Sequence, residues 1–250
     1  MGQSKRNNPY YLDNCLLIVQ SSFYNESYKN TVEKIKRSGK KVDAIITDPP
    51  YNISRENNFT SIGRAGIDFG EWDKGFNQKR WIKTVTPIVK DGGSIIIFND
   101  WRNMGIIADA LEKYGFIVKD ILRWKKKNPM PRNVNRRYVT DFELAIWAVK
   151  GDKEKWTFNN HREDYYLRPE FTYSAYVASK KRIHPTQKSV KLIQDIIKIH
   201  TNVGDTIYDP FSGSGSISFA AKKENRNYIG SEIDYDYYLA SIERLQKNED

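Results

Sequence analysis

The fold of this 250-residue chain is indicated by residues 42–51, which read VDAIITDPPY. The β-branched run from Val42 to Thr47 predicts a buried strand, and two consecutive prolines cannot continue a central strand. The strand therefore stops in a rigid turn that carries the Asp48 carboxylate, outward-facing carbonyls and the Tyr51 ring. In open α/β sheets ligands bind beyond the carboxyl ends of the strands, so this turn is a candidate functional site.

Short apolar runs alternate with longer amphipathic segments on both sides of this stretch. Further strands are predicted over residues 16–20, 93–98, 116–124, 142–149, 206–208 and 227–229, and helices over residues 26–37, 80–89, 103–114, 189–200, 214–223 and 235–246. This order predicts one α/β domain over residues 1–250, with a mostly parallel twisted sheet and helices on both faces. Residues 152–182 are basic and aromatic without clean periodicity, which favours a small target-recognition insert.

The excess positive charge lies in the middle third of the chain. Residues 119–191 hold 18 Lys and Arg against 8 Asp and Glu, which equals the net charge of +10, so the remainder is neutral. Aromatic residues such as Trp124 and Trp156 are interleaved with this charge. A polyanion that releases counterions on binding suits such a region. The alternative is a solvated basic face that only aids solubility.

Composition argues against several other classes of protein. Cys15 is the only cysteine, so no disulfide within the chain is expected, and His161, His184 and His200 lack ligand spacing, so no metal is expected. No apolar run approaches the roughly 20 residues of a membrane span. The N-terminus also lacks the pattern of a signal peptide or a myristoylation site. We therefore expect a cytoplasmic protein with no membrane partner.

The turn at residues 48–51 has the groups needed to hold an exocyclic amine. Such an amine presents two N–H donors, and the Asp48 carboxylate and the Pro49 carbonyl are two acceptors. Accepting both hydrogens pulls the nitrogen lone pair out of conjugation and directs it towards a methyl donor. Pro50 stiffens the turn, and Tyr51 can stack on a base that has been flipped out of a duplex. A turn that merely ends a strand is the alternative, because a tetrapeptide also recurs by chance.

A second motif, DPFSGSG at residues 209–215, also follows a predicted strand and opens a helix. Its glycines allow a close backbone approach, and a helix N-terminus favours a carboxylate. The absence of Lys after the last glycine excludes a phosphate-binding P-loop, and the glycine spacing fits a dinucleotide site poorly. Glu232 ends the next strand, where a carboxylate can bind both hydroxyls of a ribose. Without this loop before it, Glu232 would be better interpreted as an exposed acid.

These motifs resemble those of the β-class amino-methyltransferases of DNA found in type II restriction–modification systems, over nearly the whole chain. In that class the target-amine motif precedes the cofactor motif, a circularly permuted order, and Asp48 precedes Asp209 here. Residues 184–188, which read HPTQK before a predicted helix, and the strand at 142–150 are further signatures. Residues 66–73 and 128–133 resemble loops of a subgroup of small adenine methylases.

The resemblance implies a Rossmann-like methyltransferase fold, S-adenosylmethionine as cofactor, and methyl transfer to N6 of adenine in double-stranded DNA. It assigns catalysis to Asp48, Pro49, Pro50 and Tyr51. The cofactor site that it implies consists of Ser22, Phe23, Asp48, Pro49, His184, Thr186, Asp209, Phe211, Gly213, Ser214, Gly215 and Glu232. Ser22 replaces an acidic residue that usually contacts the cofactor adenine, so Asp13 is the alternative source of a carboxylate. DNA contacts are expected at Arg132, Arg136, Arg137, Lys180, Lys181 and Arg182.

Two alternative functions remain at this point. Methylation of N4 of cytosine would use the same two acceptors, although that subgroup more often resembles SPPY, so Asp48 favours adenine. A non-catalytic, cofactor-sensing DNA-binding subunit would have no need of an amine clamp. The resemblance leaves open a homodimer and a cognate restriction endonuclease.

Overall fold

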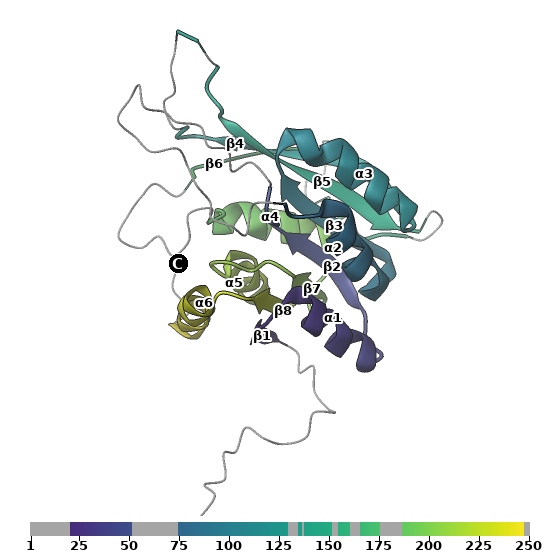
Figure 1. Ribbon diagram of the computed structural model, residues 1–250. Helices are drawn as coiled ribbons and strands as arrows, with labels where there is room; N and C mark the ends of the chain where they lie inside the picture. Colours follow the sequence, from purple (N-terminus) through teal and green to yellow (C-terminus); the bar gives the residue numbers. More distant parts are fainter. Residues whose placement is uncertain are drawn as a thin grey trace, which may run out of the picture.

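A twisted eight-stranded sheet forms the centre of the protein in the computed structural model, which describes residues 21–51, 75–129, 135–136, 138–151, 155–160, 166–175 and 187–247 (Figure 1). The strand order is β1-β8-β7-β2-β3-β5-β4-β6. Neighbours from β1 to β3 are parallel, β5 is antiparallel to β3 and β4, and β4 is parallel to β6. The strands are β1 (Ser22–Asn25), β2 (Val42–Thr47), β3 (Val89–Asn99), β4 (Phe116–Lys126), β5 (Phe142–Lys150), β6 (Glu170–Tyr173), β7 (Thr206–Asp209) and β8 (Asn227–Glu232).

Helices cover both faces of the sheet, as the alternating pattern predicts (Figure 1). One apolar cluster joins the sheet to α1, α2 and α3, and the other joins it to α4, α5 and α6. Ile45 enters the first cluster and Ile46 the second, because successive side chains of a strand point to opposite faces. The helices are α1 (Tyr28–Arg37), α2 (Gln78–Val85), α3 (Met104–Lys113), α4 (Val190–His200), α5 (Ser216–Lys223) and α6 (Tyr235–Lys247), with short 3₁₀ turns η3 (Thr86–Ile88) and η4 (Trp101–Asn103).

The predicted fold class is confirmed, and the differences concern the ends and edges of elements. The helix predicted over residues 80–89 ends earlier, because Pro87 lies in η3 and the chain enters β3 at Val89. The four-residue edge strands β1 and β6 were not predicted, since neither has an apolar run or clear alternation. The strand predicted over residues 16–20 lies outside the described residues.

The described parts of the predicted insert, residues 152–182, are attached to the sheet. Strand β6 pairs with β4 from Glu170 to Tyr173. Asn159 donates hydrogen bonds to the carbonyls of Lys198 and Thr201 at the end of α4. A role of this segment in target recognition stays a prediction.

The pairing of β2 with β7 brings the two sequence motifs together. Ala44 and Ile45 of β2 are the partners of Ile207 and Tyr208 of β7, and the strands are parallel. Both strands therefore end at the same edge, where Asp48 follows one and Asp209 ends the other. Helix α2, which follows β2, and helix α5, which follows β7, pack in different clusters on opposite faces. Ligands bind at such switch points in open α/β sheets.

Gly230 in β8 is predicted to be intolerant of a side chain. A Cβ atom there would lie 2.5 and 2.6 Å from ring carbons of Phe23 and 2.9 Å from the Ser212 hydroxyl. Because overpacking forces neighbours to shift, Gly230→Ala should lower the free energy of unfolding by about 1–3 kcal/mol. Gly105→Ala on α3 is the matched control, since its Cβ would meet no atom within 4 Å, and it should stabilise by about 0.4–1 kcal/mol. Urea denaturation measures both, and equal stabilities would contradict the packing of β1 on β8.

Candidate active site

The turn after β2 is held by side chains from two helices. Gln78 at the start of α2 donates from Nε2 to the Pro50 carbonyl at 2.7 Å, and the Trp81 indole in turn donates to Gln78 Oε1 at 2.8 Å. Asn103, which directly precedes α3, donates from Nδ2 to the Tyr51 carbonyl at 2.7 Å. The Pro49 carbonyl receives no hydrogen bond from any described residue, so this acceptor is available.

The carboxylate of Asp48 lies in a buried polar cluster. Its Oδ2 atom is 2.8 Å from Lys188 Nζ, and its Oδ1 atom accepts a hydrogen bond from the Tyr51 hydroxyl. Burial raises the pKa of Asp48, and the positive charge of Lys188 acts in the opposite direction. The Tyr51 hydroxyl thus faces Asp48, while stacking of its ring on a base stays a prediction.

Lys188 also pairs with a second carboxylate, that of Glu143 in β5. Its Nζ is 2.8 Å from Glu143 Oε2, and Lys126 Nζ at the end of β4 is 2.7 Å from Glu143 Oε1. Although burial opposes it, the charges of Lys188 and Lys126 lower the pKa of Glu143 to about 2. Sequence reasoning assigned no role to either partner. Glu143 is an acid at the start of an apolar strand and Lys188 ends the HPTQK motif, so both signals were present.

The loop at residues 209–215 has a backbone shape that depends on glycine and on contacts to α6. Gly213 and Gly215 have φ angles of 48° and 67°, in the left-handed region where a Cβ atom is strained. Ser241 Oγ donates to the Gly213 carbonyl at 2.9 Å, and Arg244 Nη1 donates to the Ser214 carbonyl at 3.1 Å. The side chains of α6 therefore hold the loop in its shape, and a ligand site that is preformed in this way loses less conformational entropy on binding.

Asp209 links this loop to β2 and leaves one oxygen unpaired. Its Oδ1 atom accepts hydrogen bonds from Thr47 Oγ1 at 2.8 Å and from the Phe211 N–H at 3.2 Å. Its Oδ2 atom is buried without a hydrogen-bond partner, and the residue is 1% exposed. Burial raises the pKa of Asp209 to about 7, against the bonds from Thr47 and Phe211. An unpaired buried carboxylate oxygen fits a cationic group such as the ammonium of S-adenosylmethionine.

Glu232 ends β8 on the far side of the loop. Its Oε2 atom accepts from the Gly213 N–H at 2.6 Å and its Oε1 atom from the Asp234 N–H at 2.8 Å. Burial raises the pKa of this carboxyl. A carboxylate has about four lone-pair sites, so two remain for the hydroxyls of a ribose. Phe211 points elsewhere, into an aromatic cluster with its ring centroid 5.1 to 5.4 Å from those of Tyr28, Phe76 and Trp81.

Ser22 lies at the start of a strand in the structure, where the sequence analysis expected it to follow one. Ser22 and Phe23 lie within β1, where Ser22 pairs with Ile229, and the strand ends at Asn25 beside Glu232. Ser22 is therefore at the amino end of the strand, and the acidic residue that follows the strand is Glu26. The strand predicted over residues 16–20 lies outside the described residues, and a role of Ser22 at the cofactor adenine stays a prediction. The Phe23 ring packs beside Gly230 and Tyr238.

Several predicted site residues lie outside the described part of the chain: Asp13, Arg132, Arg137, His184, Thr186, Lys180, Lys181 and Arg182. Arg136 is described and exposed. Within the described ranges no group of three or more His, Cys, Asp or Glu could hold a metal, and no helix there is long and apolar enough to cross a membrane.

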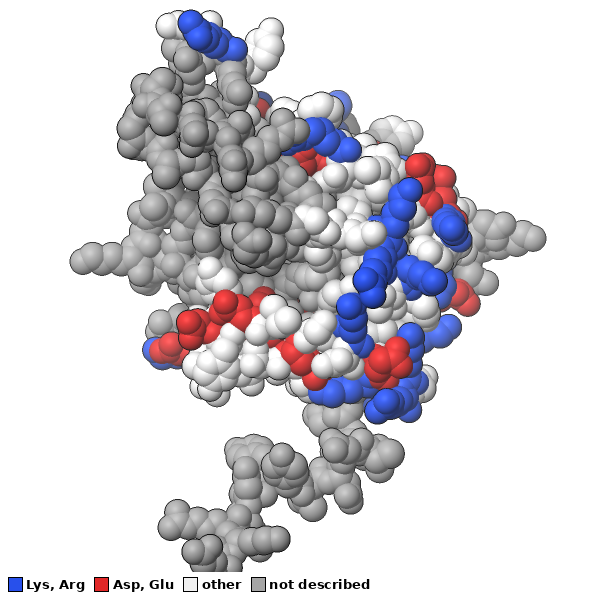
Figure 2. All heavy atoms as spheres, in the orientation of Figure 1, with Lys and Arg blue, Asp and Glu red and all other residues white. Residues whose placement is uncertain are grey.

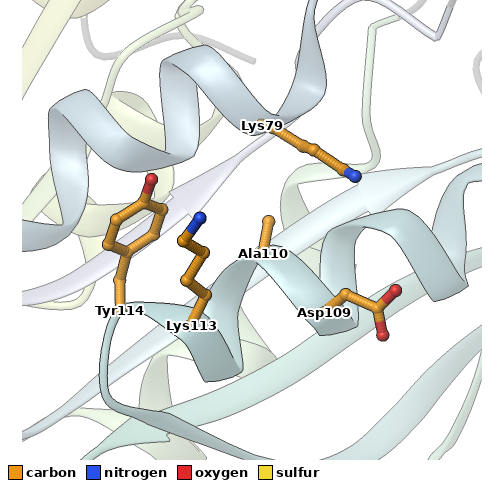
Figure 3. A pocket seen from close by; sticks show the side chains of 5 residues that line it. All are labelled: Lys79, Asp109, Ala110, Lys113 and Tyr114. Atoms are coloured by element: carbon orange, nitrogen blue, oxygen red, sulfur yellow. The ribbon is translucent and has the colours of Figure 1, made fainter.

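A shallow pocket with a volume of about 160 Å³ lies between α2 and α3, and none of the predicted site residues lines it. Figure 3 shows Lys79 extending from α2 and the Ala110 methyl between Lys113 and Asp109 on α3. The remaining lining residue is Tyr114. Its two lysines are surface side chains, so the pocket indicates no specific ligand.

Comparison with known proteins decides the family. Residues 42–243 match the DNA methylase family. The chain belongs to that family. It is 34% identical to the type II methyltransferase M2.LlaDCHI of Lactococcus lactis subsp. cremoris, an alignment that covers 96% of this chain and 92% of that protein. It is 31% identical to M2.DpnII of Streptococcus pneumoniae, over 95% of this chain and 92% of the relative.

Solved structures support the same assignment. The crystal structure of M1.HpyAVI in complex with S-adenosylmethionine is 39% identical in sequence, with a TM-score of 0.74, and the match covers 90% of this chain and 98% of that one. The cytosine-N4-specific PvuII methyltransferase shares the fold alone, at 16% identity and a TM-score of 0.66 over 91% of this chain and 90% of that one. The protein is a site-specific DNA methyltransferase that uses S-adenosylmethionine, which confirms the predicted family, fold, enzyme class and cofactor.

Asp209 should make the cofactor-free protein less stable as the pH rises. Its folded pKa of about 7 exceeds the ordinary value of 3.8, so between these values the folded protein holds a proton that the unfolded chain has released. Stability is then lost as pH rises through this window. Asp209→Asn should therefore raise the free energy of unfolding at pH 8 by about 1 kcal/mol or more, since each pKa unit corresponds to about 1.4 kcal/mol, with no gain near pH 4.

The same substitution should weaken S-adenosylmethionine binding, measured by calorimetry, because the ammonium loses its counter-ion. The exposed Asp91→Asn is the control and should change neither quantity. An Asp209→Asn variant that is no more stable at pH 8 than at pH 4, relative to the unmodified protein, would contradict the unpaired carboxylate.

Proposed function

We propose that this methyltransferase modifies N6 of adenine in double-stranded DNA, with the Asp48 carboxylate and the Pro49 carbonyl as the two acceptors of the target amine. The observation that carries the proposal is the position of these acceptors beside the Asp209 loop, tied to it by the Thr47–Asp209 hydrogen bond. An aspartate at the first position of the turn favours adenine over N4 of cytosine. The base must leave the duplex to reach such a site.

The residues of the chain mainly orient the reactants. The cofactor supplies an activated methyl group, so no covalent enzyme intermediate is needed. Two acceptors fix the amine so that its lone pair forms the N–C bond as the C–S bond breaks, and one N–H proton leaves by way of Asp48. Asp48 need not be a strong base, because the nitrogen becomes acidic only as the methyl group arrives.

The proposed cofactor contacts lie at the same edge of the sheet as the turn that holds the amine. We assign the ammonium to Asp209, the ribose hydroxyls to Glu232, and backbone approach to Phe211, Gly213, Ser214 and Gly215. Asn25 and Glu26 are better placed than Ser22 to reach the adenine, since Asn25 pairs with Glu232 and donates to its carbonyl at 3.0 Å. His184 and Thr186 are proposed to lie near the methionine part.

Asp48→Ala should abolish methylation and leave the affinity for S-adenosylmethionine within about a few-fold, because the clamp acts mainly on the amine. Transfer of labelled methyl groups to DNA and calorimetric titration with the cofactor measure the two effects. Asp109→Ala, an exposed carboxylate on α3, is the control and should keep full activity. Near-normal turnover by Asp48→Ala would refute the clamp. Nucleoside analysis of the product identifies the base, and N4-methylcytosine would overturn the assignment to adenine.

We place the DNA contacts in the basic middle third, at Arg132, Arg136, Arg137, Lys180, Lys181 and Arg182. Figure 2 shows a second run of Lys and Arg on the side of α1 and α2. The residues outside 119–191 have no net charge in total, but basic side chains are gathered on these two helices. The exposed basic residues there are Lys29, Lys34, Lys36, Arg37, Lys79, Arg80 and Lys83.

Charge reversal tests which of the two basic regions, the middle third or the residues of α1 and α2, binds DNA. Reversal of Lys180, Lys181 and Arg182 should weaken binding to every DNA sequence, and each lost phosphate contact should reduce the slope of log affinity against log salt by roughly 0.9. Reversal of Lys79, Arg80 and Lys83 is the matched control and should leave the slope unchanged. A salt series on cognate and scrambled duplexes gives both slopes, and the opposite ranking would move the DNA path to α1 and α2.

The relatives carry names of type II methyltransferases. We therefore propose that the protein acts in the cytoplasm, where bacterial DNA lies, beside a cognate restriction endonuclease. A homodimer is the proposed assembly, and sedimentation of the purified protein tests it.

A further inference from the structure

Lys188 is a buried cation whose donors are all used at the active site. Its side chain is 5% exposed, and Nζ lies 2.8 Å from Asp48 Oδ2, 2.8 Å from Glu143 Oε2 and 3.2 Å from the Tyr51 hydroxyl. An ammonium group has three hydrogens to donate, so this arrangement leaves none for water. Burial of a lysine is costly even when it is paired, and an apolar side chain would serve packing better. This cost makes a purely structural role a poor explanation.

The position of Lys188 is determined by elements on both sides of it. Ser189 is the N-cap of α4, so Lys188 lies immediately before a helix that packs in the core. Its Nζ is 5.3 Å from the centre of the Phe98 ring in β3. Glu143 in β5 holds it from the other side and is itself held by Lys126. The four charges alternate in sign from Lys126 to Asp48, so the cluster is neutral as a whole.

We propose that Lys188 and Glu143 are positioning residues for methyl transfer: Lys188 holds Asp48 as an oriented, ionised acceptor, and Glu143 holds Lys188 in place. The inference rests on the proposed role of Asp48 as an acceptor for the amine. A protonated carboxyl group would offer an O–H donor to an amine that itself donates, so the clamp works only with the carboxylate. Neither Lys188 nor Glu143 needs to touch the reacting atoms.

The electrostatics of the cluster give the two residues opposite effects on Asp48. Burial raises the pKa of Asp48, the charge of Lys188 lowers it, and the charge of Glu143 raises it. The other groups that face Asp48 are the Tyr51 hydroxyl, which donates to it, and the buried carboxyl of Asp209, with Asp100 acting on Tyr51. Without Lys188, burial and the charge of Glu143 both disfavour the ionised form of Asp48, and the hydrogen bond from Tyr51 alone among these groups favours it. Loss of Glu143 leaves Lys188 to act on Asp48 alone.

The test is the pH dependence of single-turnover methyl transfer to DNA, at saturating cofactor and substrate so that product release does not limit the rate. In Lys188→Met the acidic limb of the profile should move up by about one pH unit or more. The rate at neutral pH should fall by about tenfold to a hundredfold, the factor that a charge-assisted hydrogen bond represents, with partial recovery at high pH. Lys188→Arg keeps the charge and should keep the limb near its original position.

Glu143→Gln should move the acidic limb down, in the direction opposite to Lys188→Met. A general loss of folded protein would not move the acidic limb up in Lys188→Met and down in Glu143→Gln. The two pH profiles together therefore distinguish a positioning role from structural damage. Lys36→Met on α1 is the matched control, because Lys36 forms an exposed ion pair with Glu33 and should leave the profile unchanged. Affinity for S-adenosylmethionine should stay within about a few-fold in every variant, since none of these side chains is assigned to the cofactor.

If Lys188→Met alone does not fold, the double variant Lys188→Met, Glu143→Gln removes one charge of each sign and keeps the cluster near neutrality. Its acidic limb should also move up, because the burial of Asp48 is then unopposed by Lys188. A folded variant that lacks a positive charge at position 188 and keeps the original limb overturns the proposal. An active Asp48→Ala variant would instead overturn the clamp on which the proposal rests, so the two failures are distinguishable. The identity of the methylated base does not affect the measurement.

Discussion

The parallel pairing of β2 with β7 is the constraint on which the site depends. These strands are distant in sequence, yet their register sets Asp48 and Asp209 at the same edge, and the Thr47–Asp209 hydrogen bond links the two turns directly. Parallel strands need crossover helices, which here fall on opposite faces after β2 and β7. The turn at residues 48–51 and the loop at residues 209–215 therefore meet because the strands that precede them are paired. The order of the motifs along the chain is secondary to this pairing.

The two aspartates at this edge, Asp48 and Asp209, differ in their hydrogen-bond and charge partners. Asp209 is buried with one oxygen unpaired, and burial raises its pKa to about 7. Asp48 is paired with Lys188 and hydrogen-bonded by Tyr51. In the proposed cofactor site a cationic group supplies the missing partner of Asp209, an arrangement in which stability is given up for affinity. Asp48 has its counter-ion, Lys188, within the protein, which suits its proposed role as an acceptor for a neutral amine.

Sequence reasoning predicted the parts of the site that are local. Prolines at 49 and 50 and glycines at 213 and 215 end strands or allow unusual backbone, so their effect is visible within a few residues. Most of the fold follows from the same local periodicity. Gln78, Asn103, Glu143 and Lys188 act through partners in other elements, and no short window of sequence shows which strand end each will face. Strand β1 was missed for a related reason, because it is a short edge strand whose bounds depend on its pairing with β8.

The reversed direction of β5 explains why the Lys188 cluster can exist. In a fully parallel sheet the first residues of a strand lie at the edge opposite to the site. Because β5 runs antiparallel to β3, its second residue, Glu143, lies at the edge where β2 and β3 end. Strand β4 is antiparallel to β5, so its last residue, Lys126, reaches the same edge and pairs with Glu143. One antiparallel strand thus supplies a carboxylate that Lys188 can bridge to Asp48, and through Lys126 it connects the turn at residues 48–51 to the end of β4.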